Sequence, residues 1–324
     1  MMISTLSVHK FYGESRKGFK DFKTTACAPS GRPHPKVEET LQLVPEPVLV
    51  RSCGCGFPFP VGIDGLKILD LGCGCGRDAY LACALVGPQG FVTGIDLLPE
   101  QVQVAEEHAD SFCQRLRYPR SHLRFMVGSI EDLKSAKIED GSQDILISNC
   151  VINLSFNKQK VFDEAYRVLT SGGEFHFSDM YIDRHLDSHV LDHQELWGEG
   201  LLGALTLSEF EDIVKKAGFS QIHRVHSNPI AIVDEHVKSL LGSARYQSVT
   251  HRVFKLPQSE NVGMSGQIAA AYLGSISGQP EVYRLSQQHE FKTGLPTHVD
   301  SALEALLSSS WLAKHFHLRM ATDF

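Results

Sequence analysis

The stretch from Lys67 to Asp96 constrains the fold of this chain more than any other. Short apolar runs occupy Lys67–Leu71 and Phe91–Ile95, and a helical pattern fills Asp78–Val86 between them. Apolar runs of this length, bounded by glycine turns, predict buried strands. A strand, a glycine turn, a helix and a second strand within roughly 30 residues form the nucleotide-binding half of a doubly wound sheet. The predicted fold class is therefore α/β.

The glycine spacing in this stretch separates two classes of cofactor. The turn has three alternate glycines, Gly72, Gly74 and Gly76. A dinucleotide site places its third glycine one residue later, where this chain has Arg77. Asp70 lies in the first strand, and Asp96, at the tip of the second, can accept both hydroxyls of a ribose. This combination resembles the S-adenosylmethionine site of class I methyltransferases rather than a nicotinamide site.

Composition excludes several functional classes. The chain has 324 residues with a net charge of −7 and no basic cluster, which argues against a nucleic-acid partner. It has no apolar run long enough for a membrane span, and its N-terminus lacks the apolar core of a secretory signal. We therefore expect a cytoplasmic protein and a monomer, whose eight cysteines are thiols rather than a disulfide framework. All eight precede residue 151, so thiol chemistry belongs to the first half.

The chain divides into three predicted parts. Residues 1–45 form a helical extension, packed on the core or acting as a lid, with Cys27 in a loop. Residues 46–257 form the cofactor-binding domain, and residues 258–324 a small α+β appendage after a polar linker. The patterns predict further helices at 99–117, 158–169, 207–217 and near 299–316. They predict further strands at 123–127, 144–149, 174–178, 221–225, 248–255, 268–275 and 289–293.

Two patterns are compatible with a metal site, but an interpretation without a metal is preferred for both. Cys53 and Cys55 could bind zinc together with Cys73 and Cys75, but a C-x-C spacing is unusual for zinc ligands. Packing is the preferred role of Cys73, Cys75, Cys83 and Cys113. The His- and Asp-rich residues 183–205 match no metal signature, and an exposed amphipathic insert is expected.

Residues 128–133, GSIEDL, follow the third strand and can hold an adenine ring. Ile130 and Glu131 are the expected pair, with Asp132 as the competing acid. A helix start with acids favoured by the helix dipole explains the same pattern.

Asn149 ends the fourth strand and is assigned to the cofactor. Cys150 follows at the carboxyl end of the sheet, where open α/β sheets bind ligands. A thiol there is the best functional candidate in the chain, against the alternative of a buried, inert cysteine.

SNCVINL at 148–154, together with DLGCGCGRD at 70–78, resembles the arsenite S-adenosylmethionine methyltransferases. The similarity continues through FYG at 11–13, GCG at 54–56, GSIEDL, AYRVLTSGGEFHFSD at 165–179 and LWGE at 196–199. It implies a Rossmann-like class I methyltransferase fold that uses S-adenosylmethionine. It also implies arsenite or methylarsenite as substrate, catalytic thiols at Cys27, Cys55 and Cys150, and glutathione or thioredoxin as reductant. Cys55 and Cys150 would hold trivalent arsenic.

The chain departs from that family at two positions. The family's fourth cysteine is replaced by Gly200, and an aromatic residue before Gly-Cys-Gly is replaced by Cys53. Three outcomes stay open. The enzyme methylates arsenic with an altered ligand set, slowly or stopping at an early product. Alternatively, Cys53 replaces the missing ligand. In the third outcome the protein methylates another soft acceptor, such as a thiol or a selenium compound, or binds arsenic without turnover.

Overall fold

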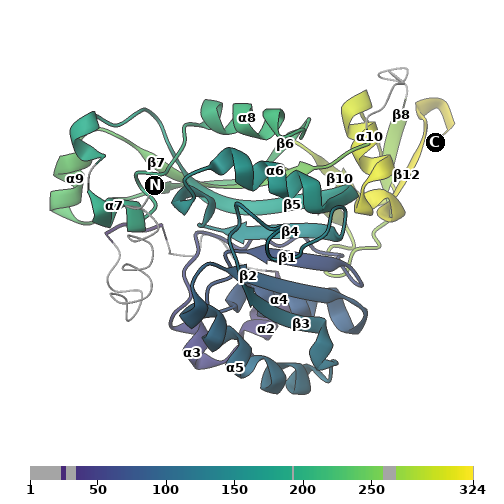
Figure 1. Cartoon of the computed structure of the whole chain (residues 1–324). Helices are drawn as coiled ribbons and strands as arrows, with labels where there is room; N and C mark the ends of the chain where they lie inside the picture. Colours follow the sequence, from purple (N-terminus) through teal and green to yellow (C-terminus); the bar gives the residue numbers. More distant parts are fainter. Residues whose placement is uncertain (1–22, 27–33, 192, 258–267, 324) are drawn as a thin grey trace.

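The computed structural model describes residues 23–26, 34–191, 193–257 and 268–323 (Figure 1). A seven-stranded sheet in the order β3-β2-β1-β4-β5-β7-β6 forms the centre. Its strands are β1 (Lys67–Leu71), β2 (Phe91–Asp96), β3 (Leu123–Val127), β4 (Gln143–Asn149), β5 (Leu169–Ile182), β6 (Ile222–Ile230) and β7 (Tyr246–Phe254). Neighbours from β3 to β5 pair parallel, and β7 runs antiparallel to β5 and β6. The doubly wound α/β fold is confirmed.

Helices cover both faces of this sheet (Figure 1). α4 (Arg77–Val86) and α5 (Pro99–Leu116) cover one face, and α6 (Lys158–Val168) and α8 (Leu207–Lys216) cover the other. α2 (Pro35–Leu41) packs on α4 and α3 (Glu46–Leu49) on α5, whereas α7 (Gln194–Gly198) and α9 (Glu235–Leu241) lie beyond one end of the sheet. Successive residues of a strand point to opposite faces of the sheet, so each strand contributes side chains to two cores. Ile68 packs with α4 and α5, whereas Leu69 packs with α6 and α8. Strands buried on both faces explain why their sequences read as continuous apolar runs.

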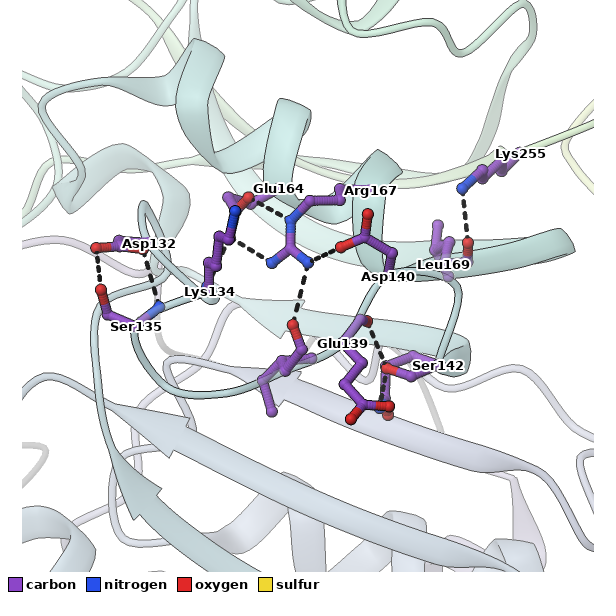
Figure 2. A network of polar contacts seen from close by, with 12 residues as sticks. Asp132, Lys134, Ser135, Glu139, Asp140, Ser142, Glu164, Arg167, Leu169 and Lys255 are labelled. Carbon is purple, nitrogen blue, oxygen red and sulfur yellow. Dashed lines mark hydrogen bonds and ion pairs between the residues drawn. The ribbon is translucent and has the colours of Figure 1, made fainter.

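Arg167 near the end of α6 fixes the long connection from β3 to β4 (Figure 2). Its guanidinium donates to Glu164, to Asp140 and to the carbonyl of Ile138 at 3.0 Å. Glu164 in turn accepts the backbone N–H of Lys134 at 3.0 Å. The connection is thereby held against α6, which leaves the preceding residues 128–131 directed to the carboxyl end of the sheet.

The C-terminal part is a small α+β unit, as predicted. It contains β8 (Ile268–Tyr272), β9 (Val282–Arg284), β10 (Glu290–Lys292), β11 (Pro296–His298), α10 (Ser301–Ser309) and β12 (Phe316–Met320). The strands form a three-stranded sheet, β11-β8-β12, and a hairpin of β9 and β10. Its core includes Phe254 of the central sheet, so the unit continues the main fold.

Four expectations about the elements need correction. The predicted helix near 299–316 ends at Ser309, because Ser310 caps a separate 3-10 turn that leads into β12. The glycines at 172–173 lie inside a longer β5, where a side chain at Gly172 (φ 81°) would clash with the carbonyl of Ser309. Residues 183–205 are not simply an exposed insert, because Val190, Leu196 and Leu201 join a buried cluster. Short elements α3, α9, β9, β11 and β12 were not predicted.

Some expectations lie outside the described residues. These include Cys27, most of the N-terminal extension and most of the predicted linker before β8. No helix in the described ranges has the length and apolar character that a membrane crossing requires.

Candidate active site

A cavity of about 640 Å³ opens at the carboxyl ends of β1, β2 and β4. Gly72 and Gly74 of the predicted glycine turn, Asp70, Asp96, residues 128–131, Asn149, Cys150 and Gly200 all contribute to its lining. Gly76, the third predicted glycine, does not line it and lies against Phe125 instead. Cys53 on the loop before β1 also faces it. The fold therefore brings residues from six separate stretches of sequence to one place, as expected for the carboxyl edge of an open α/β sheet.

The glycine turn is shaped for close approach of a ligand. Gly72 has φ 73°, and a Cβ there would collide with the side chain of Val151. Gly74 has φ 53°, and a Cβ there would meet nothing within 4 Å. A side chain is thus excluded at Gly72 by packing and at both positions by the backbone, and the open side of Gly74 faces the cavity.

Asp96 holds the glycine turn through hydrogen bonds to the backbone. Its carboxylate accepts the N–H of Gly74 at 2.8 Å and that of Leu98 at 2.9 Å. Burial raises the pKa of Asp96, and these backbone hydrogen bonds oppose the rise. A carboxylate has about four acceptor sites, so Asp96 keeps acceptor capacity for the hydroxyls of a ribose.

Asp70 is a buried carboxyl group with one oxygen atom that lacks a hydrogen-bond partner. It is 2% exposed, and its Oδ2 atom has no hydrogen-bond partner. Burial, and then the nearby carboxylates Asp78 and Asp96, raise its pKa well above the usual value. A buried carboxyl group of this kind fits a cationic ligand, which would supply the missing partner. These residues therefore fit the cationic S-adenosylmethionine that the glycine turn implies.

The two acids that compete for the predicted adenine site, Glu131 and Asp132, lie in different places. Ile130 and Glu131 line the cavity. Glu131 Oε1 also accepts the Ser155 hydroxyl at 2.6 Å, which ties it to the residues after Cys150. Asp132 instead accepts the N–H and hydroxyl of Ser135, at 3.1 and 2.6 Å, outside the cavity (Figure 2).

Sequence reasoning missed three residues that line the cavity beyond Asp96, namely Leu97, Leu98 and Gln101. Their position directly after the acid that ends β2 was the available signal.

Cys55 and Cys150 form a disulfide in this structure, with Cα atoms 6.0 Å apart and a sequence separation of 95. Cys150 has φ 57° and donates its N–H to the carbonyl of Ser178 at 2.8 Å. The left-handed backbone at the end of β4 turns the chain sharply, so the thiol lies at the strand end. The two predicted thiols are thus in direct contact, although the expectation that all cysteines are thiols is wrong for this pair.

Asn149 fixes the Cys55 loop over the strand ends. Its Oδ1 accepts the N–H of Cys55 at 2.9 Å, and its Nδ2 donates to the Gly56 carbonyl at 2.9 Å and to Asp78 at 2.7 Å. The amide is therefore engaged by protein groups on both ends, and it positions the first thiol beside the second.

Gly200 lines the same cavity. It has φ 77°, and a Cβ there would lie 2.7 Å from Cε of Met180. A side chain at this position would need Met180 to move and would carry the strain of a left-handed backbone.

The other cysteines are mostly buried. Cys73, Cys75, Cys83 and Cys113 are all less than 9% exposed, as expected for packing residues. Within the residues that the structure describes, no group of three His, Cys, Asp or Glu side chains could hold a metal ion.

Residues 63–218 match the family described as "Methyltransferase domain". The chain is 39% identical to the arsenite methyltransferase of Aquipseudomonas alcaligenes over 96% of its length and 89% of that protein. It is also 39% identical to the human arsenite methyltransferase, over 96% of this chain and 83% of that protein. The crystal structure of an arsenic(III) S-adenosylmethionine methyltransferase from Chlamydomonas reinhardtii superposes with a TM-score of 0.84 and 44% identity, covering 89% of this chain and 97% of that one.

Proposed function

This chain belongs to the arsenite methyltransferase family, and from that premise we propose that it methylates trivalent arsenic held by Cys55 and Cys150. The observation that carries the proposal is that Cys150 lines the cavity that contains the glycine turn, and that the buried Cys55 is in direct contact with it through the disulfide. One ligand-binding region thus joins two thiols with the features of a cofactor site.

Thiolates are the natural ligands of trivalent arsenic, because arsenic in this state is soft and thiophilic. Two cysteines whose Cα atoms are 6.0 Å apart can form a disulfide, and in reduced form they can bind one arsenic atom between them. Arsenic bound to sulfur keeps a lone pair, so methylation requires no general base. The contribution of the protein is then to position the reactants and to exclude water.

S-adenosylmethionine, when bound, supplies a methyl group on a positively charged sulfur. In our proposal the glycine turn, Asp96, Ile130 and Glu131 hold its nucleoside, and Asp70 faces its cationic part. Asn149 holds the Cys55 loop so that both thiols meet at the cavity.

The observed disulfide supports a redox role for the same pair. Methyl transfer raises the oxidation state of arsenic by two. Cys55 and Cys150 can return two electrons by forming their disulfide, which an external dithiol such as thioredoxin, or glutathione, then reduces by exchange. This cycle needs reducing conditions, which supports a cytoplasmic location.

The third sulfur ligand is the open part of the proposal. Gly200 cannot supply it, and Cys27, Cys53 or glutathione can. With an exchangeable third ligand we expect methylation to be slow or to stop at an early product.

Arsenic speciation of the reaction products tests the proposal. Purified protein is incubated with S-adenosylmethionine, arsenite or methylarsenite, and glutathione or a thioredoxin system, beside Cys150→Ser. We expect methylated arsenic from the native chain and a loss of at least about tenfold in the variant, because one ligand is gone. No methylated arsenic from the native chain, with methylation of selenite or a thiol instead, would overturn it.

The missing thiol is tested by Gly200→Cys with Gly200→Ala as its matched control. Both variants carry the same backbone strain and the same contact with Met180, but only one adds a sulfur. Faster or further methylation by Gly200→Cys than by Gly200→Ala is expected if the third ligand limits the reaction. Equal rates would show that the remaining ligands suffice.

A further inference from the structure

The loop that carries Cys55 is bound to the sheet by hydrogen bonds that do not involve its sulfur. The N–H of Cys55 donates to Asn149 at 2.9 Å, and its carbonyl accepts the hydroxyl of Ser248 on β7 at 3.0 Å. Cys55 is 1% exposed and Ser248 is 6% exposed, so both bonds are buried. Because they use backbone atoms of Cys55, these bonds do not require the disulfide.

Ser178 on β5 lies between the two segments that carry the thiols. Its carbonyl accepts the N–H of Cys150 at 2.8 Å. Its hydroxyl faces Gly56, because a Cβ on Gly56 would lie 2.7 Å from Ser178 Oγ. Thr250, the neighbour of Ser178 across β7, fixes that hydroxyl with 2.7 Å between the two oxygens. Ser178 therefore contacts the backbone beside each thiol.

We propose that Ser178 and Ser248 are positioning residues that keep the reduced Cys55 loop against the sheet, so that the two thiols form a site before arsenic binds. This inference rests on the proposed function of Cys55 and Cys150. Two thiols that are already adjacent bind one arsenic atom, or close to a disulfide, at a smaller cost in conformational freedom than thiols on a free loop. Loss of these contacts should therefore weaken arsenical binding and make the disulfide easier to reduce.

The equilibrium of the Cys55–Cys150 disulfide with dithiothreitol measures how well the reduced loop stays in place. The disulfide takes two electrons and two protons from dithiothreitol, which closes into its own cyclic disulfide. Alkylation followed by peptide mass spectrometry reads the state of these two cysteines separately from the others. The ratio of reduced to oxidised dithiothreitol at half-oxidation gives the equilibrium constant for disulfide formation.

Arsenical binding is measured with phenylarsine oxide, which binds dithiols without a redox change. Two arsenic–sulfur bonds replace the arsenic–oxygen double bond, both thiol protons leave with the oxygen as water, and arsenic stays trivalent. Protection of Cys55 and Cys150 from alkylation reports binding at this site. A native chain without such protection would overturn the proposed function, whereas the dithiothreitol equilibrium would still test the positioning role. Neither measurement requires methyl transfer.

Ser248→Ala removes one hydrogen bond to the loop. The disulfide forces the loop into place without that bond, whereas the reduced loop can leave. We therefore expect the equilibrium constant for disulfide formation to fall about threefold to tenfold, and phenylarsine oxide to bind more weakly. Affinity for S-adenosylhomocysteine should stay within about twofold, because Ser248 contacts the loop and not the glycine turn. Ser227→Ala, which removes a hydroxyl that donates to Gln247 at 3.0 Å, is the control and should keep native values.

Gly56→Ala tests Ser178 through a rescue. Alanine fits the backbone at Gly56, whose φ lies outside the left-handed region, but its methyl group collides with the Ser178 hydroxyl. That hydroxyl cannot turn away without leaving Thr250. We expect the equilibrium constant to fall at least about fivefold, because the reduced loop escapes the collision and the disulfide-bonded loop does not. Adding Ser178→Ala leaves the two Cβ atoms 3.3 Å apart and should restore most of the loss.

The outcomes separate the two residues. A native equilibrium constant in Ser248→Ala would overturn the role of Ser248. A native constant in Gly56→Ala, or a loss that Ser178→Ala fails to rescue, would overturn the role of Ser178. An equal loss of S-adenosylhomocysteine affinity in Ser248→Ala would overturn the proposal, because general destabilisation would then explain the result. If Gly56→Ala does not fold, Ser248→Ala alone decides the proposal.

Discussion

Asn149 connects the chemistry of the site to the stability of the fold. One side chain accepts from Cys55 and donates to Gly56 and Asp78, and it is 7% exposed. Buried amides that satisfy three partners are costly to replace, because each partner is left without water as a substitute. At this position the loss also frees the loop that carries the first thiol.

Asn149→Asp tests this connection. The new carboxylate cannot donate to Gly56 and would lie against the carboxylate of Asp78, so we expect the free energy of unfolding to fall by about 3 kcal/mol. We expect methylation to fall by at least about tenfold, because the Cys55 loop loses its anchor.

The control is Asn157→Asp, at the exposed N-cap position of α6, where the side chain accepts from the N–H of Lys160 and aspartate caps equally well. It should change the free energy of unfolding by less than about 0.5 kcal/mol in urea titrations. A normal methylation rate in Asn149→Asp would contradict the assigned role.

At the scale of the elements, the two outer strands carry buried histidines that make folding depend on pH. Burial, and then the charge of Arg224, lower the pKa of His251 on β7 to about 3. Burial, and then the charge of Arg252, lower that of His223 on β6 to about 4. An unfolded histidine has a pKa near 6.5. The unfolded chain therefore takes up these protons first, and stability is lost as the pH falls below about 6.5.

His251→Phe should reduce this loss. Phenylalanine preserves the ring packing against Phe210, whose centroid lies 4.6 Å away, but it cannot take up a proton. Between pH 6.5 and 4.5 the free energy of unfolding should fall by about 2 kcal/mol less than in the native chain. Urea titrations at both pH values measure the difference. His185→Phe, at a side chain that is 80% exposed, is the control and should follow the native chain. An equal loss in His251→Phe and the native chain would contradict the assignment.

At the scale of the whole molecule, a buried polar network joins the central sheet to the C-terminal unit. Arg252 on β7 pairs with Glu174 on β5 at 2.7 and 2.8 Å and donates to the hydroxyl of Tyr283 at 2.7 Å. Trp311 donates its indole N–H to Glu174 at 2.8 Å. Burial would raise the pKa of Glu174, but Arg252 and His176 together lower it to about 2. The two parts should therefore unfold together.

Arg252→Met tests this network. It leaves the Glu174 carboxylate, which is fully buried, without its cation, and should cost about 3–5 kcal/mol of unfolding free energy. Trp311→Phe keeps the ring and removes one donor, and should cost about 1–2 kcal/mol. Arg284→Met removes an exposed pair with Glu290 and should cost less than about 1 kcal/mol. Two separate transitions in the native chain, seen by calorimetry, would contradict a single cooperative unit.

The strands of the central sheet could be predicted from the sequence, whereas several strands of the C-terminal unit could not, and the difference has a physical reason. β1, β2 and β4 are buried on both faces, so their apolar runs identify them as strands even when the neighbouring strands are unknown. β9, β11 and β12 are short strands of three to five residues whose identity depends on pairing with β10 or β8. Local patterns cannot report such pairing.

In the candidate site, too, some features could be predicted from the sequence and others could not. The glycine turn, Asp96 and Cys150 follow from position in the strand–turn–helix pattern. The engagement of Asn149 with the Cys55 loop and the partnerless Oδ2 of Asp70 depend on residues distant in sequence.

The bond between Cys55 and Cys150 also closes a covalent ring around the glycine turn and the strands β1 to β4. Closing a ring of this size removes freedom from the unfolded chain, by about 4–5 kcal/mol in the chain-entropy model. The oxidised chain should therefore melt at a higher temperature than the reduced chain, although only the reduced chain can accept arsenic. A thermal screen without reductant would rank the oxidised chain, which cannot bind arsenic in our proposal, as the best preparation. Assay and storage buffers should therefore be chosen by free-thiol content rather than by melting temperature.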